Sequence, residues 1–114
     1  MKLGIVVVYR VAERNEMLLD VHLRQIEKNT QVPYAIYGSA EGLPPRFRGK
    51  LENSPRVRLC DVTPYDGTHT HDRRRYEHSF YLEQLIKAAI ADDVSHVCVL
   101  HVDSFPVRFG WAQH

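Results

Sequence analysis

The stretch LGIVVVY at residues 3–9 is a short run of apolar, largely β-branched residues. A continuous run of this kind is typical of a strand that is buried on both faces of a sheet. The segment that follows, residues 13–28, is rich in charge but places Leu19, Leu23 and Ile26 at helical spacing. It therefore predicts an amphipathic helix. A buried strand followed by such a helix is how a parallel α/β sheet begins.

Three more strands and one more long helix follow in the pattern. The strands are predicted at residues 34–37, 57–62 and 95–102 and the helix at residues 73–91. We expect the strand at residues 34–37 to stop at Gly38-Ser39. The residues that follow, up to position 56, are interpreted as a polar loop because they contain Pro44-Pro45, Gly49 and Pro55. Right-handed crossovers between these strands predict a three-layer α/β/α fold with a four-stranded, mainly parallel sheet. No linker divides the chain, so we expect a single domain over residues 1–114.

The composition excludes several classes of protein. The chain of 114 residues has 15 Lys and Arg against 14 Asp and Glu, a formal net charge of +1, which argues against nucleic acid as a partner. No apolar run approaches the length of about 18 residues that a membrane span needs. The first apolar run is too short for a signal peptide. We expect a cytoplasmic protein in which Cys60 and Cys98 are buried thiols rather than a disulfide.

The predicted last strand ends in polar residues, in the stretch VCVLHVDSFP at residues 97–106. His101 and Asp103 are two apart and so point to the same face, while Val102 points to the other. An imidazole and a carboxylate together suit a divalent cation such as Mn²⁺, Fe²⁺ or Zn²⁺. Ligands of open α/β sheets bind at the carboxyl ends of the strands, where this pair lies. The alternative is that the pair begins an ordinary loop, with Asp103 capping the turn.

The order of these elements resembles the nucleotide-sugar-binding half of a GT-A glycosyltransferase. LHVDSFP is similar to the strand end that carries the Asp-x-Asp motif of that family, with His101 and Asp103 at the two aspartate positions. The resemblance implies that these two residues hold Mn²⁺ or Mg²⁺ on the diphosphate of a nucleotide-sugar. Together with the buried first strand, it implies the sheet order 3-2-1-4.

Two further stretches take part in the resemblance. VVVYRVAERNE fits the opening strand and turn where base and ribose bind, which implies that Tyr9 and Arg10 contact the nucleotide. RRRYEHSFYLEQLIKAA resembles the helix before the Asp-x-Asp strand, whose start faces the nucleotide, and implies roles for Arg74 and His78. Members of the family usually continue for at least as long again. The chain is therefore expected to be a GT-A-like domain that is incomplete at its C-terminus and does not transfer sugar alone.

Two other functions stay open at this point. The chain could be a catalytically silent α/β interaction domain, or a small metal-dependent hydrolase that uses His69 and His71 together with His101 and Asp103. A homodimer is expected in either case, because the fourth strand would be an edge strand with an apolar run and no charge or proline in its middle. Its interface would include the fourth strand and residues 109–111.

Overall fold

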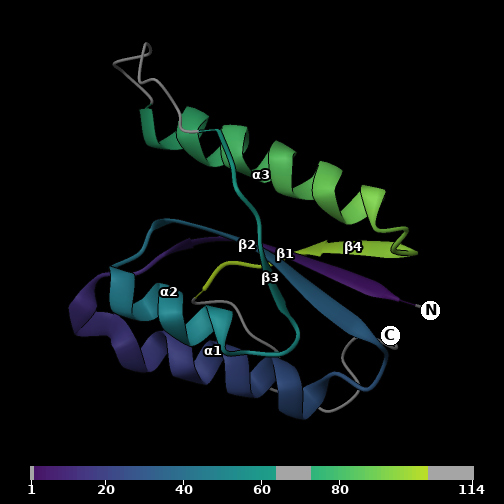
Figure 1. Ribbon diagram of the computed structural model, residues 1–114, viewed down its shortest axis with the longest axis horizontal. Coiled ribbons are helices and arrows are strands. Elements are labelled where there is room, and N and C mark those ends of the chain that lie inside the picture. Colours follow the sequence, from purple (N-terminus) through teal and green to yellow (C-terminus); the bar gives the residue numbers. More distant parts are fainter. Residues whose placement is uncertain (1, 64–72, 103–114) are drawn as a thin grey trace.

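Figure 1 shows the computed structural model, which describes residues 2–63 and 73–102. The elements, in chain order, are β1 (Leu3–Arg10), η1 (Glu13–Asn15), α1 (Glu16–Asn29), β2 (Tyr34–Gly42), α2 (Pro45–Glu52), β3 (Val57–Leu59), α3 (Arg73–Ala91) and β4 (His96–Val99). Within the described residues, no helix combines the length and the apolarity that a transmembrane span requires.

The strands form one all-parallel sheet in the order β3-β2-β1-β4, which confirms the expected order. The apolar run at residues 3–9 becomes the central strand β1, whose residues pair with β2 on one side and β4 on the other. Ile5, for example, pairs with Ile36 of β2 on one side and with Cys98 of β4 on the other. β1 carries almost no polar side chains because helices cover both faces of the sheet at this strand.

Helices cover both faces of the sheet. Alternate residues of β1, Ile5 and Val7, pack with α1 and α2 on one face, whereas Val6 packs with α3 on the other. Figure 1 shows the same arrangement, with α1 and α2 on one side of the strands and α3 on the other. The predicted three-layer α/β/α fold is therefore correct.

Helix α2 lies inside the segment that we predicted to be a loop, so that prediction was wrong. Pro45 stands at the first turn of the helix, where a missing N–H costs nothing. Phe47 and Leu51, four residues apart, are both fully buried against the α1 face of the sheet. This burial outweighs the cost of Gly49 in the middle of the helix, which is about 1 kcal/mol.

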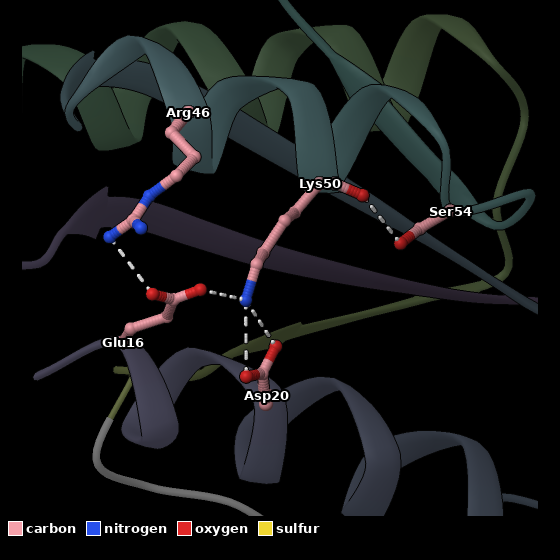
Figure 2. A network of polar contacts seen from close by, with 5 residues as sticks. All are labelled: Glu16, Asp20, Arg46, Lys50 and Ser54. Atoms are coloured by element: carbon pink, nitrogen blue, oxygen red, sulfur yellow. Dashed lines mark hydrogen bonds and ion pairs between the residues drawn. The ribbon is translucent and has the colours of Figure 1, made fainter.

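A network of charges attaches α2 to the start of α1 (Figure 2). Lys50 Nζ contacts Glu16 and donates to Asp20 Oδ1 at 3.0 Å, while Arg46 lies 2.9 Å from the other oxygen of Glu16. The carboxylates of Glu16 and Asp20 raise the pKa of Lys50 above its ordinary value. The basic residues of this segment are thus engaged within the fold. Ser54 closes the end of the helix by donating to Lys50 O at 3.0 Å.

The strand boundaries also differ from the prediction. β2 does not stop at Gly38 but continues to Gly42 alongside β1. β3 is shorter than predicted, since its pairing ends at Leu59 and the backbone of Thr63 instead bonds to the side chain of Gln84 on α3 (N–H to Oε1, 2.7 Å). β4 ends at Val99, although Leu100 N–H still donates to Val6 O of β1 at 3.1 Å.

Candidate functional site

The sheet order creates a switch point between β1 and β4. From β1 the chain adds β2 and β3 on one side, and α3 then carries it back across to β4 on the other. In open α/β sheets, ligands usually bind outside the carboxyl ends of the strands at such a point. The site therefore lies where β1 ends at Arg10 and where the chain leaves β4.

Helix α3 runs in the opposite direction to the strands. Its last turns lie beside the start of β1, since a Cβ at Gly4 would sit 3.4 Å from Ala89. The first turns of α3 consequently point toward the carboxyl end of the sheet. The prediction placed Arg74 and His78 in these first turns, and both residues belong to α3. Their side chains are not among the described parts of the chain.

Arg10 and His101 are the described polar residues at the switch point, and both are exposed. Val102 next to His101 is buried in the α1 side of the core, with 7% exposed. The register between β1 and β2 is irregular near the end of β1. Val8 pairs with Ser39 but Arg10 pairs with Gly42, so an advance of two residues on β1 matches an advance of three on β2. Such irregularities commonly redirect a side chain beside a binding site.

The second predicted metal ligand, Asp103, lies outside the described residues, as do His69 and His71. Within residues 2–63 and 73–102, no group of three or more His, Cys, Asp or Glu side chains is close enough together to hold a metal ion. His101 therefore has a position at the switch point, while the Mn²⁺ or Mg²⁺ site that pairs it with Asp103 stays a prediction.

Tyr9 has a different environment from the one that the resemblance implies. Its side chain is fully buried, its hydroxyl lies 3.0 Å from His22 Nε2, and the two rings meet edge to face at 5.4 Å. Burial raises the pKa of Tyr9 far above its ordinary value. The ring thus contributes to the core beneath the site, and a ligand at the switch point would meet the end of β1 at Arg10 instead.

Ser39 is a residue at this end of the sheet that sequence reasoning did not assign to the site. It pairs in register with Val8, is fully buried, and its Oγ has no hydrogen-bond partner. An unsatisfied buried hydroxyl costs about 1–3 kcal/mol, so such groups are often kept for a ligand or a bound water. The sequence signal was present, since a serine interrupts an otherwise apolar strand, but we interpreted it as a strand stop.

The two cysteines do not form a disulfide, as predicted. Both are free and half-buried, and they lie beside β3 and in β4, at opposite edges of the sheet. Burial raises the pKa of both thiols, which lowers their thiolate fraction below that of an ordinary cysteine.

Comparison with protein-family models, with curated proteins and with solved structures found no match to this chain. The architecture defines an open, parallel α/β domain with a switch point between β1 and β4. The GT-A resemblance rests on the order of the elements and on the local motifs.

Proposed function

We propose that this chain is a nucleotide-sugar-binding domain of the GT-A type that binds its ligand at the switch point between β1 and β4. The observation that carries the proposal is the position of Arg10 and His101, both exposed at the carboxyl ends of these two neighbouring strands. A guanidinium at this position is suited to a diphosphate, to which it can donate two parallel hydrogen bonds.

The remaining residues have complementary roles in the proposal. His101 and Asp103 hold Mn²⁺ or Mg²⁺, which neutralises charge on the nucleoside diphosphate. Arg74 and His78, which belong to the first turns of α3, are assigned to the same ligand. A helix N-terminus already favours an anion through its dipole and its free N–H groups, and the cationic side chains add to that preference. The two free thiols agree with a cytoplasmic setting.

Calorimetry with UDP-, GDP-, CDP- and dTDP-sugars, each with and without Mn²⁺, tests the proposal. We expect saturable binding of at least one nucleotide-sugar that strengthens when Mn²⁺ is present. Arg10→Gln is expected to weaken that binding by about tenfold or more, since a hydrogen bond to a charged group contributes about 1.5–3 kcal/mol. Arg24→Gln, which changes an exposed arginine of α1, is the matched control and should leave the affinity unchanged.

The metal contribution is tested separately. Asp103→Ala and His101→Ala should each remove the effect of Mn²⁺ while the circular-dichroism spectrum stays that of the wild type. Equal Mn²⁺ dependence in wild type and both variants would exclude these two residues as ligands. Absence of binding across the whole panel would instead favour a catalytically silent interaction domain.

A further inference from the structure

A pocket of about 430 Å³ lies at the amino-terminal edge of the sheet, the edge opposite to the candidate nucleotide site. Its lining comes from the starts of three strands. Lys2 precedes β1, Tyr34 and Ala35 begin β2, and Pro55 and Arg56 lead into β3, to which Arg58 belongs. The volume is within the range of about 300–1,000 Å³ that is usual for small-ligand sites.

Three cationic residues, Lys2, Arg56 and Arg58, line this pocket, and the protein does not fully neutralise their charge. Arg58 lies 3.2 Å from Asp92 Oδ2, and Asp92 also accepts a hydrogen bond from Tyr37 at 3.0 Å. Within the part of the chain that the structure describes, Lys2 and Arg56 form no ion pair. The pocket therefore carries excess positive charge on two side chains from different strands.

Arg56 is also held in a defined orientation. Its guanidinium carbon lies 4.7 Å from the centroid of the Tyr34 ring, and its Nη1 donates a long hydrogen bond of 3.5 Å to Tyr34 O. A guanidinium that is stacked on a ring keeps the donors at its edge available for an anion. Glu27 lines a smaller adjoining pocket of about 90 Å³, on which Tyr34 and Arg56 also border, but it does not line the larger one.

We propose that this pocket binds a phosphate group, held by the edge of the Arg56 guanidinium and by the ammonium of Lys2. A phosphate dianion matches two unneutralised cations, and the fork of an arginine matches the spacing of its oxygens. The group can belong to inorganic phosphate or to a small phosphomonoester. This site is separate from the proposed nucleotide site, because the length of the strands lies between them.

Nuclear magnetic resonance titration of the full chain tests the proposal, with inorganic phosphate and phenyl phosphate as probes and chloride at matched ionic strength. Saturable shifts of the Ala35, Arg56 and Arg58 amides are expected with phosphate and not with chloride. Tighter binding of phenyl phosphate would identify a phosphomonoester as the ligand class, and equal binding would identify free phosphate. Absence of saturable shifts with both probes would overturn the proposal.

Substitutions locate the bound phosphate. Arg56→Gln and Lys2→Gln should each weaken binding about tenfold, and Arg56→Lys should recover only part of it because the fork is lost. Arg24→Gln and Arg10→Gln should leave it unchanged. Loss of phosphate binding in Arg10→Gln together with full binding in Arg56→Gln would place the phosphate at the switch point and overturn this assignment. Unchanged amide dispersion in each variant shows that it is folded.

Discussion

The ring of Tyr9 lies directly over Gly38 on the neighbouring strand. A Cβ at position 38 would come within 2.5 Å of Tyr9 Cε2 and 2.7 Å of Tyr9 Cδ2. The ring cannot move aside freely, because its hydroxyl is bonded to His22 at 3.0 Å and its whole side chain is buried. Gly38 interrupts the apolar pattern of β2, and because it has no side chain it leaves the space that the Tyr9 ring of β1 occupies.

Gly38→Ala should therefore destabilise the protein by about 1–3 kcal/mol, the usual cost of overpacking a core. The measurement is the free energy of unfolding in urea. Gly49→Ala is the matched control, because nothing lies within 4 Å of a Cβ at that position of α2. It should stabilise the protein by about 1 kcal/mol through helix propensity. A neutral Gly38→Ala would show that the Tyr9 ring does not fill this space.

The free energy of unfolding should fall at alkaline pH because Tyr37 loses its proton there. Its side chain is almost fully buried, and burial, followed by the hydrogen bond to Asp92, raises its pKa from 10.0 to about 12. The protonated hydroxyl is thus favoured in the folded state, so its contribution is complete below pH 10 and is lost as the pH rises through about 12. The difference in unfolding free energy between wild type and Tyr37→Phe should shrink across this range. A constant difference would contradict the raised pKa.

Asp93 has a left-handed backbone conformation, with φ of 63°, just after the end of α3. A residue with a β-carbon pays a strain of about 1–2 kcal/mol there, which aspartate only partly avoids and glycine does not pay. Asp93→Gly should therefore raise the thermal midpoint of unfolding, whereas Asp93→Val should lower it. The same pair of substitutions at Asp92, within the turn but without positive φ, should not show this reversal of sign.

The edge strand β4 should mediate a homodimer. α3 packs on β1 and β2, and it leaves Val97 and Val99 at 40% and 42% exposed, while no strand within the described residues pairs with the outer side of β4. Natural sheets usually protect such an edge. Sedimentation at micromolar concentration should show a dimer for the wild type and a monomer for Val99→Lys. A wild-type monomer, or a dimer that Val99→Lys does not affect, would contradict this interface.

The helices and strands that could be predicted have a strong local signal. The β-branched run of β1 and the helical spacing in α1 and α3 each predict the element that the structure contains. Right-handed crossovers then leave few ways to arrange the sheet. The particular order 3-2-1-4 was predicted from the buried first strand together with the GT-A resemblance. The placing of Arg10 and His101 at the carboxyl ends of their strands was accessible from the sequence, because strand direction alone decides which end they occupy.

The tertiary structure decided the rest, because there the local and long-range preferences conflict. Pro44-Pro45 and Gly49 locally favour a loop, but burying Phe47 and Leu51 on the sheet makes α2 a helix. Tyr9 was predicted to contact the nucleotide because of its place in the chain, but its ring is buried in the core, where it fills the space beside Gly38. Lys2, Tyr34 and Arg56 are far apart in sequence, and only the pairing of three parallel strands brings their starts together around one pocket.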